Sequence, residues 1–393
     1  MKAIQKIVFV SLFFVLLLPM LPADEVSAVW ARVYRNAVSL EHRYAIMERI
    51  VDQDNREFIP LLDEALRDLV MMWEDLPSET DRAVHRRLVN LVTGELGRLK
   101  ASQSAPVVYR VMAERDNAFQ ESIAITALAE MGAREYAGRI AMRLKTLNMG
   151  AVEYTSREEI ETVAASCVYA LERLGQPEGY EPVFFASMAG YSAPVMKKID
   201  RALGTMMDDP TDILKSILIE YTDPDIKIRA LEEAARSKAD PEKKIAVAAE
   251  ALNQGLTINV ESNRMAFALS RLRTGAAAMI RDTGIDSIDV SALLRIMLTR
   301  MFELNEILTC LEALGTQKND MAAKTLADFL QYHNQRPSDL RSEDDYRIVT
   351  ATIQAMGNTG NALVIPQLAE VGFRDWNRPV RKAAEEALAK LGQ

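Results

Sequence analysis

Cysteine and histidine are scarce in this chain, whose 393 residues include two cysteines and three histidines. The histidines, His42, His85 and His333, lie far apart, and no HExxH, CxxC or paired-histidine spacing is present. A metal site is therefore not expected. GxSxG, Walker-type and GxGxxG motifs are absent too. With no convergent set of reactive residues, we expect a protein that is not an enzyme and carries no cofactor.

Aromatic residues make up only 6% of the chain, and Ala, Leu, Met, Glu and Arg dominate its composition. These residue types favour helices over strands. Positive charge is also in short supply, because 47 Lys and Arg stand against 56 Asp and Glu, a formal net charge of -9. This balance disfavours nucleic acid and anionic lipid as partners. We expect the local basic clusters to be solvated or ion-paired on helix faces: Arg82, His85, Arg86 and Arg87, and Arg264, Arg271 and Arg273.

One long apolar run stands at the start of the chain, from Ile7 to Leu21, and it follows Lys2 and Lys6. At fifteen residues it is short for a spanning helix, which needs about 20. The pattern predicts a signal peptide at residues 1–23, with cleavage as late as residue 28 as an alternative. We expect an exported protein, periplasmic or secreted, with no stable membrane span after cleavage. Retention of the segment as an anchor is the other interpretation.

Apparent helix ends recur along the remainder of the chain, at intervals typical of two-helix solenoid repeats. They lie at Leu96-Gly97, Met131-Gly132, Leu174-Gly175, Leu314-Gly315, Met356-Gly357 and Leu391-Gly392. Weaker ends near Gly204, Lys238 to Asp240 and Gly275 divide the longest interval. Glycine suits the position after a helix because it adopts the left-handed conformation at low cost. The sequence predicts an all-α fold, an α-solenoid (superhelix) of about 8–9 stacked antiparallel helix pairs over residues 24–393.

Apolar and small residues recur at helical spacing before these glycines, which predicts the core-facing stripe of each second helix. The segment from Gly175 to Asp240 contains five prolines, and Pro241 follows it directly. We therefore expect shortened or kinked helices near residues 176–240. The three clearest stripes are Ile123, Ala124, Ala127, Leu128 and Met131; Val163, Cys167, Ala170, Leu171 and Leu174; and Val380, Ala383, Ala384, Ala387, Leu388 and Leu391.

The closing segment, DWNRPVRKAAEEALAKLG from Asp375 to Gly392, resembles HEAT-repeat α-solenoids, particularly the HEAT-like repeats of phycobilisome lyases. A second stretch, DPDIKIRAL from Asp223 to Leu231, repeats an Asp and an Arg six residues apart. In the resembled repeats a turn aspartate and a helix arginine typically form a ladder along the stack. The resemblance therefore implies structural rungs at Asp223 with Arg229 and at Asp375 with Arg381.

Both cysteines, Cys167 and Cys310, fall at small-residue core positions about four repeats apart. Helices pack 8–10 Å apart, so stacked repeats place these residues roughly 30 Å or more from each other. A disulfide requires Cα atoms within about 7 Å. The sequence therefore predicts two buried free thiols.

Three aromatic residues in the proline-rich middle, Phe184, Phe185 and Tyr191, lie close together near a predicted turn. Aromatic clusters are enriched at binding surfaces, and they also wedge between repeats. We take these three as the candidate binding patch, with wedging as the alternative.

The leading hypothesis is an exported HEAT-repeat scaffold that binds a protein or peptide along its concave helical surface, which second helices usually line in the resembled family. One alternative is a carrier of a small tetrapyrrole-like ligand, or a lyase-type enzyme built on a solenoid. Another alternative is a mechanical spacer in an envelope assembly.

Overall fold

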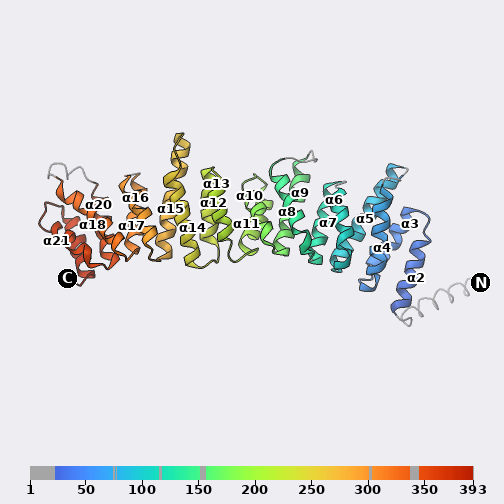
Figure 1. Cartoon of the computed structure of the whole chain (residues 1–393). Coiled ribbons are helices and arrows are strands. Elements are labelled where there is room, and N and C mark those ends of the chain that lie inside the picture. The colour runs from blue at the N-terminus through green and yellow to red at the C-terminus, as the bar shows by residue number, and fades with distance from the viewer. Residues whose placement is uncertain are drawn as a thin grey trace, which may run out of the picture. The chain divides into compact units, whose positions relative to one another are not determined.

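A computed structural model describes residues 23–73, 76, 78–114, 117–150, 156–300, 303–336 and 345–392. Within these residues it contains twenty α-helices and no strand (Figure 1). The prediction of an all-α solenoid is confirmed. The predicted signal peptide, apart from Ala23, lies outside the described residues.

The chain divides into two compact units, which we call unit 1 (Met1–Met207) and unit 2 (Asp208–Gln393). Unit 1 contains α2 (Ala23–Arg35), α3 (Leu40–Val51), α4 (Ile59–Met72), α5 (Glu79–Arg98), α6 (Ala105–Glu114), α7 (Ala118–Met131), α8 (Ala137–Asn148), α9 (Arg157–Leu174), α10 (Tyr180–Ala186) and α11 (Ala193–Thr205). Unit 2 contains α12 (Thr211–Glu220), α13 (Pro224–Arg236), α14 (Pro241–Thr257), α15 (Asn263–Thr283), α16 (Ile288–Thr299), α17 (Leu304–Thr316), α18 (Asp320–Gln335), α20 (Tyr346–Thr359), α21 (Ile365–Val371) and α22 (Arg378–Lys390).

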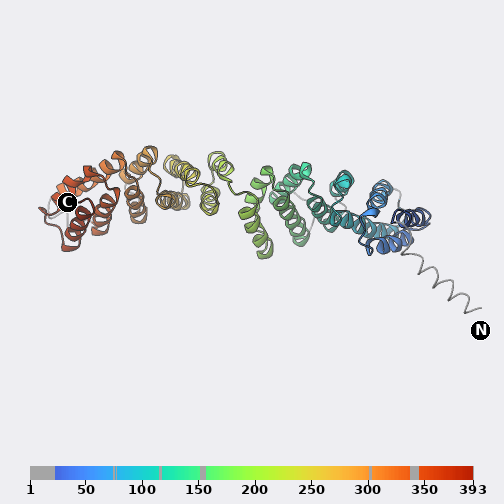
Figure 2. The ribbon, with the colours of Figure 1, turned by 90° about the horizontal axis from the view of Figure 1, so that it is seen from below.

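The twenty described helices form ten successive pairs, slightly more than the predicted eight or nine. Within each unit the first helices of the pairs lie in one layer and the second helices in another (Figure 2). In unit 1, α5, α7, α9 and α11 contact one another in turn, and in unit 2, α13, α15, α17, α20 and α22 do the same. Near the boundary between the units, α10 has seven residues and α12 has ten.

The core of each unit lies between these two layers, and the predicted stripes of the second helices face it. Val380, Ala383, Ala384 and Ala387 of α22 are buried, and the whole stripe of α9 from Val163 to Leu174 is buried as well. These positions alternate apolar and small residues at helical spacing, which lets neighbouring helices approach closely. The predicted core pattern is therefore confirmed for α9 and for the first four positions of α22, whereas Leu388 and Leu391 are half-buried.

Glycines have two different roles at the helix ends that the sequence predicted. Gly132 and Gly175 end α7 and α9 in the left-handed conformation, with φ of 71° and 61°. Gly97, Gly315 and Gly357 instead lie inside α5, α17 and α20. The predicted helix ends are correct to within two residues, because α5, α17 and α20 end at Arg98, Thr316 and Thr359, but these glycines do not adopt the left-handed conformation.

The interior glycines mark close contacts between successive second helices. A Cβ atom at Gly97 would lie 2.7 Å from the Cα of Ala127, and one at Gly315 would lie 2.9 Å from the Cα of Ala355. Real side-chain carbons do not come so near a neighbouring backbone, because van der Waals repulsion prevents it. Glycine at these positions therefore sets the spacing between α5 and α7 and between α17 and α20.

The helix α15 is also longer than the sequence predicted, because Gly275 lies in its middle and not at its end. Gly284 ends it with φ of 62°. At 21 residues, α15 reaches beyond the neighbouring helices of unit 2 at one edge (Figure 1).

Candidate functional site

The aromatic patch predicted at Phe184, Phe185 and Tyr191 is part of the packing of unit 1. Phe184 is fully buried, with 0% of its surface exposed, and Phe185 meets it edge-on at 5.2 Å between ring centroids. The Tyr191 hydroxyl donates a hydrogen bond of 3.0 Å to Oδ1 of Asn148 at the end of α8. Phe185 and Tyr191 are half-buried. Of the two interpretations of these aromatic residues, wedging between helices therefore describes them better than an open binding patch.

The predicted rungs between aspartate and arginine are also not formed among the described residues. The Asp223 carboxylate caps α13 by accepting the backbone N–H of Asp225 at 2.9 Å. Arg229 lies 3.0 Å from Glu233, one turn further along the same helix. Asp223 therefore acts as a helix cap, and Arg229 pairs with a glutamate of its own helix.

At the second predicted rung, Asp375 and Arg381 are both exposed. The capping role at α22 belongs to Asn377, whose Oδ1 accepts the N–H of Val380 at 3.1 Å. Trp376 is buried beside it, and its Nε1–H donates to Asn334 at 2.9 Å. The turn is therefore fixed by Trp376 and Asn377, and the predicted pair contributes no rung.

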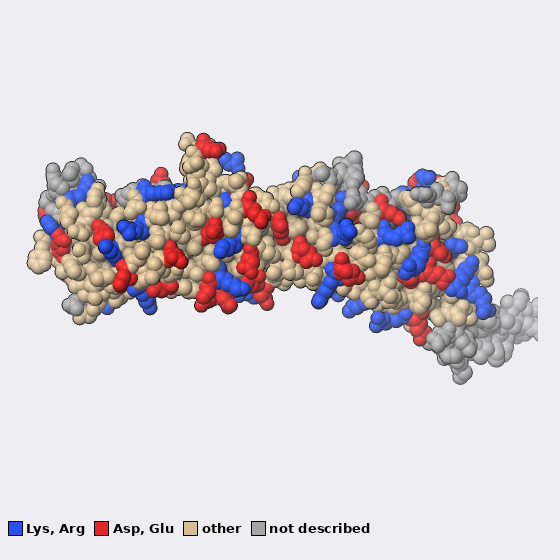
Figure 3. Space-filling model, in the orientation of Figure 1, with Lys and Arg blue, Asp and Glu red and all other residues tan. Residues whose placement is uncertain are grey.

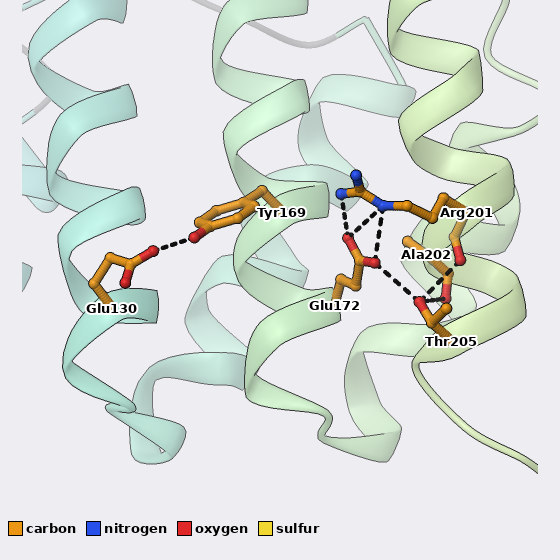
Figure 4. A network of polar contacts seen from close by, with 6 residues as sticks. All are labelled: Glu130, Tyr169, Glu172, Arg201, Ala202 and Thr205. Carbon is orange, nitrogen blue, oxygen red and sulfur yellow. Dashed lines mark hydrogen bonds and ion pairs between the residues drawn. The ribbon is translucent and has the colours of Figure 1, made fainter.

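A ladder does exist in unit 1, built from other residues on α7, α9 and α11 (Figure 4). The Tyr169 hydroxyl of α9 donates to Glu130 of α7, and this hydrogen bond raises the pKa of Tyr169. On the next helix, the Arg201 guanidinium makes contacts of 2.6 to 3.2 Å with Glu172, and Thr205 donates to the same carboxylate at 2.9 Å. Each rung joins one second helix to the next.

The same helices of unit 1 enclose a shallow hollow of about 670 Å³. Most of its lining residues are polar, among them Arg157, Glu161, Ser166 and Lys198. Ser166 shares a hydrogen bond of 2.6 Å with Ser122 of α7, and Glu161 pairs with Arg157 at 2.9 Å. The polar groups of Arg157, Glu161 and Ser166 are therefore already bonded within unit 1, and the apolar surface of the hollow is small.

In unit 2 the second helices border a larger groove, with a volume of about 1530 Å³. It follows α15, with α13 on one side, the start of α17 on another and the beginning of α14 at its margin. Apolar side chains from these helices line it: Ile228, Leu231, Ala235, Ala239, Ala266, Phe267, Ala278, Met279 and Leu304. Val260 and Phe267 at the margin have 57% and 70% of their surface exposed. Clustered exposed apolar side chains of this kind mark interaction sites.

Small residues on α15 create this groove. Ala266, Ser270, Thr274 and Ala278 follow one another at intervals of four, and Gly275 adjoins them. Residues four apart lie on one face of a helix, so the stripe forms a low floor. Larger residues at these positions would fill the space between α13 and α17.

A buried ion pair supports the groove from below. Arg273 of α15 contacts Glu306 of α17 through two bonds, Nε to Oε2 at 2.6 Å and a second nitrogen to Oε1 at 3.1 Å. It also donates to the carbonyl of Gly255 on α14 at 3.0 Å. A Cβ at Gly255 would lie 2.7 Å from Cγ of Arg273. The pair thereby fixes three helices around the groove.

Charged side chains at the margin of the groove are less constrained. Arg271 lies 3.9 Å from Glu232, and both side chains are about half exposed. Glu303, the residue before α17, makes no side-chain cap, and its carboxylate has no partner among the described residues. Lys244 of α14 donates to the carbonyl of Ala235 at 3.1 Å. The margin therefore carries a free acid on the α17 side and a lysine on the α14 side.

The spacing of the glycines predicts a helix end near Gly275, and this prediction hides the groove, because α15 continues to Thr283. The repeat of small residues every four positions from Ala266 to Ala278 continues across that glycine. It was the signal that could have revealed one long helix with a low face.

Both cysteines are buried and free, as the sequence predicted. Burial raises the pKa of each thiol well above its usual value. The Cys310 thiol donates to the carbonyl of Leu294 at 3.2 Å. Neither thiol reaches a surface on which a ligand could be attached. In the part of the chain that the structure describes, no cluster of His, Cys, Asp and Glu has the arrangement needed to hold a metal ion.

The surface charges are mixed, and Lys and Arg alternate with Asp and Glu over the face shown in Figure 3. Among the basic clusters of the sequence, Arg82 and Arg86 both contact Glu79, at 3.8 and 2.9 Å. Arg264 lies 3.3 Å from Asp225. The described helices include none with the length and apolar character that crossing a bilayer requires.

No protein-family model matches the chain, and no curated protein matches it in sequence. Two solved structures are similar in part. A crystal structure of an engineered protein is 16% identical, with 93% of this chain and 99% of that chain covered and a TM-score of 0.35. A crystal structure of importin beta is 13% identical, with 94% of this chain covered and a TM-score of 0.38. The match spans about half of importin beta, 49% of its chain.

Proposed function

We propose that this protein is a non-enzymatic scaffold that binds a protein or peptide partner on the second helices of unit 2. The observation that carries this proposal is the groove along α15, whose lining is mostly apolar and whose margin exposes Phe267 and Val260. Exposed apolar side chains that cluster in this way mark a site of interaction with another molecule. The surface charge, net negative and locally paired, fits a protein partner better than a nucleic acid.

The proposed scaffold is an exported one. The support is the sequence of residues 1–23, a basic start followed by an apolar run too short to span a bilayer. N-terminal sequencing of the protein purified from its natural host tests this. A mature protein that begins between residues 24 and 29 agrees with export, whereas an intact Met1 contradicts cleavage.

Thiol-dependent attachment of a small ligand receives no support, because Cys167 and Cys310 are fully buried. The resemblance to repeats of the lyase type therefore predicts the architecture alone. The proposed function includes no ligand attachment and no enzymatic reaction.

A photo-crosslinking amino acid in place of Phe267 tests the binding function directly. Irradiation in the natural host should produce an adduct with one defined protein, identified by mass spectrometry. Phe119 of α7 is the matched control, because it is also an exposed phenylalanine, with 64% exposure, but lies in unit 1. The same adduct from both positions, or none from Phe267, argues against a binding site on unit 2.

A further inference from the structure

We infer that the groove of unit 2 receives an amphipathic α-helix of the partner, with an apolar stripe against α15 and a basic flank towards Glu303. This inference rests on the proposed function and specifies the conformation and charge of what is bound.

The dimensions of the groove suit a helix. The small residues from Ala266 to Ala278 extend over roughly 18 Å at the 1.5 Å rise of an α-helix. A helix of about 13 residues therefore extends along the whole stripe. Small side chains on one helix allow another helix to approach to the 8–10 Å between axes typical of packed helices. The stripe on α15 therefore provides the contact face for a second helix.

An extended peptide fits the groove less well. Its walls are α13, α15 and α17, whose backbone N–H and C=O groups bond within each helix and offer no sheet edge. An extended chain would bring its own backbone polar groups against Ile228, Leu231 and Ala278. Buried polar groups without partners are costly. A helix satisfies its backbone internally and avoids that cost.

The charged residues at the margin of the groove favour a bound helix with basic residues on one flank. The pair Arg273 and Glu306 is buried and bidentate, so neither charge is available to a partner. Glu303 lies at the groove with a carboxylate that has no partner among the described residues, and the contacts of Glu232 with Arg229 and Arg271 are both long, at 3.9 Å. A Lys or Arg beside the apolar stripe of the bound helix would meet Glu303 and complete an ion pair.

Three labelled peptides of 14 residues test the inference by fluorescence anisotropy with the full chain. The first is a helix-forming peptide with a leucine stripe and lysines along one flank. The second replaces the flanking lysines by glutamates, and the third carries two central prolines that prevent a helix. We expect the lysine peptide to bind most tightly, the glutamate peptide about tenfold more weakly, and the proline peptide not to bind measurably.

Variants of the chain place the binding in the groove. Thr274→Leu raises the floor and should weaken binding of the lysine peptide at least about tenfold. Ser270→Leu raises the floor one helical turn away. It serves as the test variant if Thr274→Leu does not fold. Ala389→Leu, at an exposed alanine of α22, is the control and should leave affinity unchanged. Glu303→Lys should reverse the preference between the lysine and glutamate peptides.

Equal binding of the proline peptide overturns the helical conformation, and an unchanged preference in Glu303→Lys overturns the basic flank. These failures differ from failure of the proposed function. If the crosslinker at Phe267 captures a defined partner while no helical peptide binds in a manner sensitive to Thr274→Leu, the scaffold function stands and the helical occupant is wrong.

Discussion

Polar side chains join successive second helices in both units, but the second helices of unit 2 also border a larger groove. In unit 1, Glu130 and Glu172 each bond to residues of the next helix, and only a small hollow lies on this face. In unit 2, the corresponding face of α15 has small residues, and the ion pair between Arg273 and Glu306 is buried beneath it. The same architecture therefore gives a small hollow in one unit and a larger, unfilled groove in the other.

The largest effect is expected from breaking the support of the groove. Glu306→Ala leaves the Arg273 guanidinium buried without its carboxylate, which should lower the free energy of unfolding of unit 2 by about 3–5 kcal/mol. Hydrogen exchange of α15 and α17 measures the loss locally. Glu312→Ala is the matched control, because Glu312 pairs with Arg281 at the surface at 2.6 Å, and its loss should cost about 0–1 kcal/mol. Equal costs would mean that the burial of the pair is not what distinguishes unit 2.

The next effect compares two glycines of unit 1 under the same substitution. Gly97→Ala places a Cβ against the backbone of Ala127 and should destabilise by about 1–3 kcal/mol through overpacking. Gly204→Ala, inside α11, meets no atom within 4 Å and should stabilise by about 0.4–1 kcal/mol.

Denaturant unfolding of the two variants checks the difference in sign. Gly315→Ala is the corresponding substitution in unit 2, where the added Cβ would lie 2.9 Å from the Cα of Ala355. If it costs far less than Gly97→Ala, unit 2 can separate its second helices more easily than unit 1.

Unit 2 should show a pH-dependent contribution to its stability from one buried lysine. Lys227 of α13 is buried, its Nζ bonds to the carbonyl of Leu218 and to Gln254, and burial lowers its pKa below the usual 10.5. The unfolded chain then binds this proton more tightly than the folded one. The free energy of unfolding should therefore rise with pH from the folded-state pKa towards 10.5, by at most about 1.4 kcal/mol per pH unit.

Urea unfolding followed between pH 7 and 10.5 measures this slope. Lys227→Met keeps the length of the side chain and removes the titration, so its contribution to the slope should disappear. If the free energy of unfolding of the variant depends on pH as it does in the unsubstituted protein, groups other than Lys227 cause the dependence.

The smallest effect is expected at the rungs of unit 1. Tyr169→Phe removes one hydrogen bond to Glu130, which is half-buried, and should cost about 1 kcal/mol. Arg271→Ala in unit 2 removes a contact of 3.9 Å between half-exposed groups and should cost less than about 0.5 kcal/mol. Thermal unfolding of the two variants ranks them. The reverse order would show that the surface contacts of unit 2 are as strong as the ladder of unit 1.

The fold could be predicted from sequence because core stripes are local patterns. Val163 to Leu174 and Val380 to Ala387 reveal their buried faces through helical spacing alone. The roles of Gly97 and Gly315 are not local, since each depends on an alanine 30 to 40 residues later in the chain. A pattern within one helix therefore cannot tell a glycine that ends it from one that touches a neighbour.

The site was harder to predict for a similar reason. Phe184 and Phe185 are conspicuous in the sequence, but a short first helix turns them towards the core. Ala266, Ser270, Thr274 and Ala278 are inconspicuous, and they matter only because larger residues on α13 and α17 stand on either side. A hollow is defined by its borders, which come from three separate helices.

Each unit contains one of the two cysteines, Cys167 on α9 in unit 1 and Cys310 on α17 in unit 2. Both are fully buried, and burial raises the pKa of both thiols. An alkylating reagent can therefore modify either cysteine only after the helices around it separate. The chain thus has a built-in reporter in each unit, and the two alkylation rates, resolved by peptide mass spectrometry, give the opening of each half of the solenoid without any introduced label.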